Sequence, residues 1–475
     1  MRAQSEGTAV SLRKRLPGAL AGLALAASVL INLSAFAAQQ PKNIIILFAD
    51  GAAATQWDFG RYSSKVLRQQ RFVTTDIVFR DGSVGLLSVS PSNGYITDSA
   101  AAGSAMSTGH KVDFDAIAVA PDGRPFPTVM EKAKSNGKRI GLVTTAAVYD
   151  ATPAAFSVHA KSRREYQAIV DQYFALEPDV LLGGGADFFL PQGTPGGKRR
   201  DRRNLISEFR RKGYEIARDT AQLNAATGAR LLGLFAAGDM DFEIDRDSTR
   251  QPTTAEMAAV ALRTLARNSP HGFVLLVENE NIDTAGHAND AASLMRALWA
   301  FDDAVKVALD FQSRSPHTLL IVASDHESGG FSPTYALKQP GRFSRSNLLL
   351  PGEEEVQMLG QITASLGRVS VKLWENPSDD ALDDLLARFF PGFRLDADLR
   401  EAIHRRLALD RNFTHPAQNI LGRMVARQTG FYWGSSGHTS EPVIVGAIGP
   451  GAERFAGYQD NTEFGSHLLR LVSGK

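Results

Sequence analysis

A short run of small residues around Ser99 could place a nucleophile against a phosphate. The run Thr97-Asp98-Ser99-Ala100-Ala101-Ala102-Gly103-Ser104-Ala105-Met106 puts one serine after an acid and before tiny side chains. A helix that began at Ser99 would aim the hydroxyl into the field of free N–H groups, where anions are favoured. Helix starts of this composition that only pack tightly are also common, so this segment alone leaves both interpretations open.

Acids and histidines follow the ends of several apolar segments, where open α/β sheets form their sites. Asp283 and His287 are four residues apart, so they share one face if this turn is helical. A lone Asp at a strand end is commonly a turn residue or a helix cap. The joint pattern, with one exposed serine, is what favours a site. The ten histidines include seven that we interpret as surface or packing residues.

Three sets of these side chains have the chemistry of metal ligands. The sets are Asp283, His287 and His438; Asp50, Asp325 and His326; and Asp50, Thr152 and Glu278. Each of the first two offers the nitrogen and oxygen donors of a zinc site with an open position for water or substrate. The third offers the hard oxygen ligands that magnesium prefers.

Continuous apolar, β-branched runs predict the strands that must hold these residues. The runs are 43–49, 139–145, 180–182, 272–277, 318–323 and 443–448. Continuous apolarity fits strands buried on both faces. Helical patterns lie between them, most clearly over 290–311. The sequence therefore predicts an α/β fold, a three-layer sandwich with a central, largely parallel β-sheet flanked by helices.

Two stretches look inserted into this pattern. Residues 190–250 are rich in Gly, Arg and Asp and contain the basic run Lys198-Arg199-Arg200-Asp201-Arg202-Arg203, which we interpret as a solvated surface segment. Residues 332–432 lie between two predicted strands and carry helical patterns near 379–390 and 397–409. We expect this second stretch to form a cap or subdomain within a catalytic domain that spans 38–475.

The first 37 residues have the pattern of a cleaved signal peptide. A basic segment at Arg13-Lys14-Arg15 precedes an apolar stretch over 16–33, and Ala35-Phe36-Ala37 offers a small-x-small cleavage site. The alternative is an uncleaved membrane anchor, since the apolar stretch is just long enough to span a bilayer. The favoured interpretation predicts a periplasmic or secreted protein with no stable membrane anchor.

Composition narrows the functional classes further. The formal net charge of the 475-residue chain is +1, so nothing suggests a nucleic-acid binder. The chain has no cysteine, which excludes disulfides and anchoring through a lipidated cysteine. Stability must then come from a large core or bound metal, and any metal site must use His, Asp, Glu and other oxygen ligands.

The chain resembles the alkaline phosphatase family over about 43–471, parts of the two insertions excepted. Thr97-Asp98-Ser99-Ala100-Ala101, followed by Ser107-Thr108-Gly109, is similar to that family's nucleophile motif. Asp150-Ala151-Thr152-Pro153-Ala154-Ala155, with His159 and Ser162-Arg163, resembles the segment carrying a magnesium ligand and the phosphate-clamping arginine. The remaining acids and histidines occur at the family's spacing and in its order.

The resemblance implies a zinc- and magnesium-dependent enzyme that hydrolyses small phosphate monoesters and releases inorganic phosphate. It implies a phosphoserine intermediate on Ser99, Arg163 as the phosphate clamp, and two Zn²⁺ and one Mg²⁺ in the three ligand sets above. Ser99 would be a further ligand of the Asp50–Asp325–His326 zinc. Family members are commonly dimers, so a homodimer is allowed, although no residue of the sequence establishes it.

Three departures from the family pattern leave every ligand in place. Ala52-Ala53-Ala54 follows Asp50-Gly51 where relatives often have a larger residue, Thr284 follows Asp283 where they place Lys, His or Trp, and Ser328 replaces a frequent histidine. The nearest rival function is a two-metal phosphodiesterase of the same architecture. A non-catalytic phosphate- or metal-binding protein is the rival from another class, but it would not need Ser99 beside a metal site.

Overall fold

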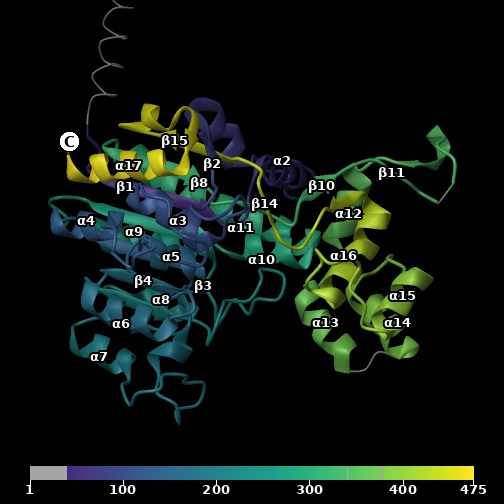
Figure 1. Ribbon diagram of the computed structural model, residues 1–475, viewed down its shortest axis with the longest axis horizontal. Coiled ribbons are helices and arrows are strands. Elements are labelled where there is room, and N and C mark those ends of the chain that lie inside the picture. The colour runs from purple at the N-terminus through teal and green to yellow at the C-terminus, as the bar shows by residue number, and fades with distance from the viewer. Residues whose placement is uncertain (1–39, 340, 376–377, 475) are drawn as a thin grey trace, which may run out of the picture. The chain divides into compact units, whose positions relative to one another are not determined.

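A ten-stranded sheet forms the centre of the molecule, with nine strands pointing in one direction and β15 in the other. The computed structural model describes residues 40–339, 341–375 and 378–474 (Figure 1). The predicted signal peptide over 1–37 lies outside the described residues. In sheet order the strands are β16 (Gly457–Asp460), β2 (Ser83–Ser88), β15 (Val443–Ile448), β8 (Thr318–Ala323), β1 (Asn43–Ala49), β7 (Phe273–Asn279), β3 (Arg139–Ala147), β4 (Val180–Gly184), β6 (Leu231–Leu234) and β5 (Glu215–Ala217).

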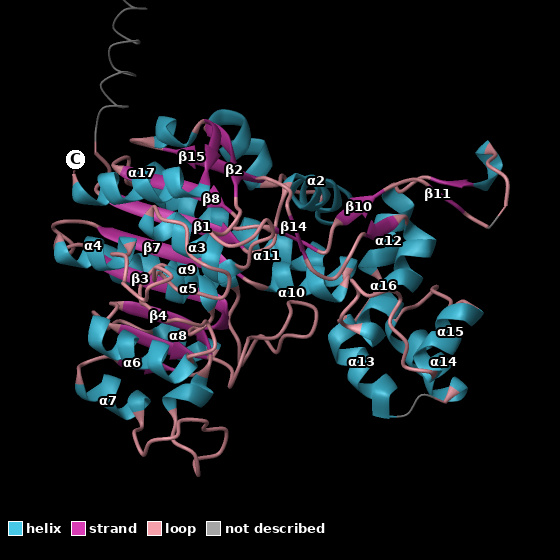
Figure 2. Cartoon of the chain, viewed as in Figure 1, coloured by secondary structure: helices cyan, strands magenta, loops and turns pink. Residues whose placement is uncertain are grey.

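Helices cover both faces of the sheet and make two hydrophobic cores (Figure 2). Alternate side chains of β1 point to opposite cores, with Ile45 and Leu47 in one and Ile44 and Ile46 in the other. The first core takes α2 (Ala54–Ser63), α8 (Thr220–Ala225), α9 (Thr254–Ala266) and α11 (Ala291–Arg314). The second takes α3 (Ser99–Thr108), α4 (Val129–Ser135), α5 (Ala151–Ala155), α6 (Tyr166–Leu176), α7 (Leu205–Arg211) and α17 (Asn461–Ser473). The predicted three-layer sandwich is confirmed.

All six predicted strands are present. Three have the predicted bounds, and β3, β4 and β7 each extend two residues further at their carboxyl ends. Strand β2 escaped prediction because its outer face is partly exposed, which breaks the apolar run into an alternating one. The short strands β5, β6 and β16 carry too few residues for a clear pattern.

The stretch 190–250 is part of the sheet, contrary to its interpretation as an insertion. It supplies β6, which pairs with β4, and β5, which closes that edge. Its basic run is also not simply solvated. The Arg199 side chain is fully buried and forms ion pairs with Asp171 at 2.8 Å and Asp201 at 2.6 Å. Local pairing with acids therefore folds part of this run into the protein.

The stretch 332–432 begins and ends at one short antiparallel ladder. Strand β10 (Phe331–Pro333) pairs with β13 (Phe431–Trp433), so the chain leaves and re-enters the sandwich at one place. Between them lie β11 (Ala336–Leu337), β12 (Leu348–Leu349), α12 (Glu353–Gly360), α13 (Leu366–Glu375), α14 (Asp379–Phe389), α15 (Ala397–His404) and α16 (Pro416–Thr429). The two helices predicted here exist as α14 and α15, although α15 ends earlier than expected.

No described helix is both long and apolar enough to cross a membrane.

Asp290 joins this segment to the sandwich. Its carboxylate caps α11 by accepting from the Ser293 backbone N–H at 2.9 Å and the Ser293 hydroxyl at 2.7 Å. It also accepts from the Leu366 backbone N–H, at the start of α13, at 2.7 Å. One buried carboxylate thus accepts hydrogen bonds from free backbone N–H groups at the starts of two helices.

We expect Asp290→Ala to lower the free energy of unfolding by about 2–4 kcal/mol, because it removes a cap and leaves buried donors unpaired. The melting temperature of the purified protein measures this change. Asp290→Asn keeps one side-chain acceptor and should lose less. Equal melting temperatures for the wild type and the alanine variant would contradict this role.

Candidate active site and metal centre

The carboxyl ends of three neighbouring strands bring three predicted acids to one edge of the sheet. Asp50 follows β1, Glu278 lies near the end of β7, and Asp325 follows β8, with β1 in the middle of the three. Strand β15 runs the opposite way, so its beginning, which His438 precedes, lies at this same edge. The reversed strand therefore explains why one predicted ligand comes before its strand and the others after theirs.

The first cluster joins Asp283, His287 and His438. The first two lie on α10 (Asn281–Ala288), as the predicted i, i+4 spacing requires, and their Oδ2 and Nε2 atoms are 3.1 Å apart. His438 Nε2 is 3.1 Å from His287 Nε2 and 3.5 Å from Asp283 Oδ1. The donor atoms therefore face a common point, and these three residues could hold one metal ion.

Backbone carbonyls orient both histidine rings of this cluster. His287 Nδ1 is 2.6 Å from the Ser436 carbonyl oxygen, and His438 Nδ1 is 2.8 Å from that of Thr97. When each Nδ1–H donates to its carbonyl, the Nε2 lone pair is left for a metal. His438 also lies in the two-stranded ladder of β14 (His438–Thr439) and β9 (Glu327–Ser328), opposite Ser328.

The second cluster surrounds His326, whose side chain is fully buried. Its Nε2 atom is 3.3 Å from Asp325 Oδ2, 3.6 Å from Asp50 Oδ1 and 3.2 Å from the Ser99 hydroxyl. Asp283 Oδ1 lies 4.0 Å from the other ring nitrogen and could serve this cluster as well. The predicted set of Asp50, Asp325 and His326 is thus brought together, with Asp283 between the two clusters and Ser99 at this one.

The third predicted set gathers around the other oxygen of Asp50. Asp50 Oδ2 is 3.5 Å from the hydroxyl of Thr152, which lies on α5. Glu278 Oε2 accepts a 2.5 Å hydrogen bond from Thr144, a neighbour that the sequence did not single out. Asp50 can therefore contribute to two sites at once, one through each carboxylate oxygen.

The donor set calls for bound cations. Among the described residues at this site, three buried carboxylate oxygens have no hydrogen-bond partner, and they belong to Asp50, Glu278 and Asp325. Burial, followed by neighbouring carboxylates, raises the pKa of Asp50 well above its ordinary value. Burial also raises the pKa of Glu278 to about 8 and that of Asp325 to about 6. Buried unpaired charge is costly, and metal ions at these oxygens would offset that cost.

Ser99 and Arg163 are brought together by one acid. Asp98 caps α3 by accepting from the Ala101 N–H at 3.1 Å, which makes Ser99 the first helical residue. The other oxygen of Asp98 pairs with Arg163 Nη1 at 3.3 Å, and Asp150 accepts from Nη2 at 3.1 Å. Asp98 thus acts both as the helix cap and as a partner of the arginine.

Two of the three departures from the family pattern have a local explanation. The Ser328 hydroxyl donates to Asp283 and lies 3.3 Å from His326 Nδ1, so it supports ligands of both clusters. The Thr284 hydroxyl donates to Glu280. Gly51 has a positive φ of 79°, and a Cβ there would lie 2.8 Å from the Asp283 Cα, so glycine lets the chain turn against α10.

The segment 332–432 also reaches this site. Asn419 on α16 donates to the His287 carbonyl oxygen at 3.1 Å and to Asn289 Oδ1 at 2.9 Å. The ring of His415, at the start of α16, lies 6.0 Å from that of His287. Asn419 could not be predicted from the sequence, because a single amide in a helix has no spacing to mark it.

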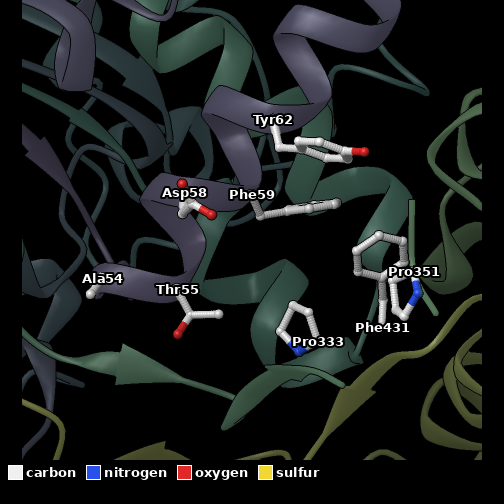
Figure 3. A pocket seen from close by; sticks show the side chains of 8 residues that line it. All are labelled: Ala54, Thr55, Asp58, Phe59, Tyr62, Pro333, Pro351 and Phe431. Atoms are coloured by element: carbon white, nitrogen blue, oxygen red, sulfur yellow. The ribbon is translucent and has the colours of Figure 1, made fainter. Parts of the chain in front are cut away.

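A second cavity lies away from these ligands and has a different chemistry. It measures about 560 Å³ and opens between α2 and the ladder that closes the 332–432 segment (Figure 3). Phe59, Tyr62 and Phe431 give it an aromatic wall, and Asp58 is its single charged residue. It lacks the convergent donors that hydrolysis needs, so the metal centre at the sheet edge is the candidate active site.

Comparison with known proteins defines the class that this fold and site belong to. The family model for alkaline phosphatase matches residues 41–473. Alkaline phosphatase 3 of Bacillus subtilis is 32% identical over 454 residues, covering 91% of this chain and 89% of that protein. The repressible alkaline phosphatase of Saccharomyces cerevisiae is 31% identical, covering 92% and 82%.

A solved structure agrees with this assignment. The alkaline phosphatase of Thermus thermophilus superposes with a TM-score of 0.82 at 29% identity, covering 92% of each chain. The architecture is that of a metal-dependent α/β hydrolase. The chain belongs to the alkaline phosphatase family and is a phosphomonoester hydrolase.

The loop that carries Arg163 is anchored by a charged histidine. His159 Nδ1 lies 3.1 Å from the Ala118 carbonyl oxygen, and Nε2 lies 3.1 Å from Glu131 Oε1. Both contacts are hydrogen bonds only if both nitrogens carry protons. Burial lowers the pKa of His159, but the Glu131 hydrogen bond and charge more than offset it and raise the pKa above its ordinary value.

This raised pKa predicts that the stabilising contribution of His159 is complete below about pH 6.5, the unfolded value, and is lost as pH rises through the folded value. We expect His159→Gln to lower the melting temperature more at pH 6 than at pH 9. The difference reflects loss of the His159–Glu131 ion pair, which contributes about 1 kcal/mol or less to the free energy of unfolding. Thermal melts of both proteins across this range measure it. A deficit that is constant or grows with pH would contradict the assignment.

Proposed function

We propose that the protein hydrolyses phosphate monoesters through a phosphoserine intermediate on Ser99, with two Zn²⁺ and one Mg²⁺ held by the three predicted ligand sets. The observation that carries this proposal is the Ser99 hydroxyl, 3.2 Å from His326 Nε2 and beside buried carboxylates that each have one oxygen without a hydrogen-bond partner. When bound, the metals would supply Lewis-acid stabilisation and lower the pKa of the serine hydroxyl.

The residues of the chain would bind and orient the phosphate. The Arg163 guanidinium suits bidentate recognition of two phosphate oxygens, and Asp98 and Asp150 hold its two terminal nitrogens. Because Asp98 directly precedes Ser99, the same side chain fixes the nucleophile and the clamp relative to each other. Such prior positioning is the main protein contribution to phosphoryl transfer.

The reaction would occur in two displacements at phosphorus. In the first, Ser99 Oγ bonds to phosphorus as the bond to the substrate alcohol oxygen breaks, and the alcohol leaves with a proton. In the second, water attacks the phosphoserine, so that inorganic phosphate leaves and the serine hydroxyl is restored. Each step exchanges one P–O bond for another, and no oxidant or co-substrate other than water is needed.

The assignment of ions follows from donor chemistry and from the resemblance. Asp283, His287 and His438 would hold one Zn²⁺, while Asp50, Asp325 and His326 would hold the other, with Ser99 beside it. Asp50, Thr152 and Glu278 offer only oxygen donors, which favours Mg²⁺. We also propose that the chain is exported after removal of residues 1–37, and that residues 332–432 form a subdomain beside the site.

Replacing the nucleophile is the direct test. We expect Ser99→Ala to lower kcat for a phosphomonoester by about 10³-fold or more, because no other residue can form the covalent intermediate. Metal content, measured by elemental analysis, should stay near that of the wild type. Ser107→Ala, on the same helix two turns away, is the matched control and should keep its activity. Wild-type hydrolysis by the Ser99 variant would overturn the assignment.

Substrate preference separates this function from its rival. A mono- and a diester of the same leaving group should differ in kcat/KM, with the monoester faster. The reverse preference would favour the two-metal phosphodiesterase.

Metal removal tests the cofactors. Exhaustive EDTA treatment should inactivate the protein, and Zn²⁺ with Mg²⁺ should restore it. The metal-free protein should melt at a lower temperature, because the buried carboxylates lose the cations that offset their charge and no disulfide replaces that contribution. Full activity after complete metal depletion, or an unchanged melting temperature, would count against this account.

A further inference from the structure

Another open pocket, of about 570 Å³ and distinct from the aromatic cavity, adjoins α10, the helix that carries Asp283 and His287. Three segments far apart in the sequence line it: the loop after β6, helix α10 and the start of α13. Glu280, the N-cap residue of α10, and Thr284 on that helix form one wall and are one helical turn apart. They precede and follow Asp283 so closely that the pocket lies on the face of α10 next to the metal ligands.

Negative charge in this pocket is only partly balanced. Its acidic residues are Asp239, Asp241, Asp245 and Glu280, and its single basic residue is Arg368. Arg368 is 3.5 Å from Asp245. Within the described residues, no lysine, arginine or histidine forms an ion pair with the other three acids.

These three acids accept hydrogen bonds from neutral donors only. Asp239 accepts from the Ala147 N–H at 2.8 Å, Asp241 from the Gln251 amide at 2.9 Å, and Glu280 from the Thr284 hydroxyl. A neutral donor leaves the negative charge uncompensated. The pocket therefore has room and charge for a cationic group from outside the chain.

The position of the pocket relates it to the departing alcohol. In an in-line displacement the leaving oxygen lies opposite the attacking one, so the alcohol points away from Ser99. Because Ser99 lies at the His326 cluster, the leaving side would be that of Asp283, His287 and His438, and α10 carries two of these residues together with part of the pocket wall. Asp239 also lies within electrostatic range of Asp150, which holds Arg163.

We propose that this pocket receives the alcohol part of the substrate and selects phosphomonoesters whose alcohol carries an ammonium group. The proposal rests on the proposed phosphomonoesterase function and adds a substrate class to it. An ammonium has three N–H donors, which match several carboxylate acceptors around one cavity. The volume is within the range of small-molecule sites.

The test compares kcat/KM for O-phosphoethanolamine, n-propyl phosphate and 2-phosphoglycolate, which carry a cationic, a neutral and an anionic group. We expect the wild type to prefer the first over the second by about three- to tenfold, the range of a partly screened ion pair. The preference should shrink at high salt. Asp239→Asn and Asp241→Asn should each lower this ratio, whereas Arg368→Gln should raise it.

Changes of opposite sign separate selectivity from general damage, because a misfolded variant loses activity on all three substrates alike. Asp58→Asn, in the aromatic cavity, is the matched control and should leave the ratio unchanged. Equal ratios in all variants would overturn the proposal. Binding of a divalent ion in the pocket would also overturn it. In that case the Asp variants would change how activity depends on Ca²⁺ or Mg²⁺ without changing the ratio of kcat/KM values for the cationic and neutral substrates. If no monoester is hydrolysed, the proposed function itself fails.

Discussion

Uncompensated negative charge at one edge of the sheet is the constraint on which the site depends. Asp50, Glu278 and Asp325 are buried at the ends of three adjacent strands, and each has a carboxylate oxygen without a partner. Apolar strands flank these groups, and the His326 ring lies 3.3 Å from Asp325 and 3.6 Å from Asp50. The protein tolerates them because cations can occupy the same small volume. Because the ligands lie at the ends of hydrogen-bonded strands, the sheet limits how far they can move relative to one another.

One reversed strand completes this arrangement. With nine parallel strands alone, every loop at the carboxyl edge would be a connection from a strand to a helix. Strand β15 instead begins at that edge, because it runs antiparallel to the others. The short β14–β9 ladder, just before it in the chain, places His438 against the other ligands. The histidine needed by the first cluster thus comes from the far end of the sequence, where no local pattern connects it with α10.

Much of this could be predicted from the sequence. Strands buried on both faces give continuous apolar runs, so β1, β8 and β15 were predicted with their exact bounds, and the strand-end acids followed from them. The partly exposed β2 and the three-residue β5 lack such a signal. The candidate ligands follow from residue type and position near predicted strand ends, from the spacing of Asp283 and His287, and from the family resemblance. The shared position of Asp283, the support from Ser328 and the contact of Asn419 with His287 depend on packing between distant segments, which spacing does not encode.

The ladder between β10 and β13 has a consequence for how this architecture can vary. Because both ends of the 332–432 segment are fixed side by side, its length adds little to the cost of closing the chain, about 0.6 kcal/mol for each doubling. Helices can be added or removed there without moving the strands that hold the ligands, provided that α13 and α16 keep their contacts with Asp290 and His287. The segment is therefore a place where lineages of one enzyme can diversify the surroundings of a fixed chemistry.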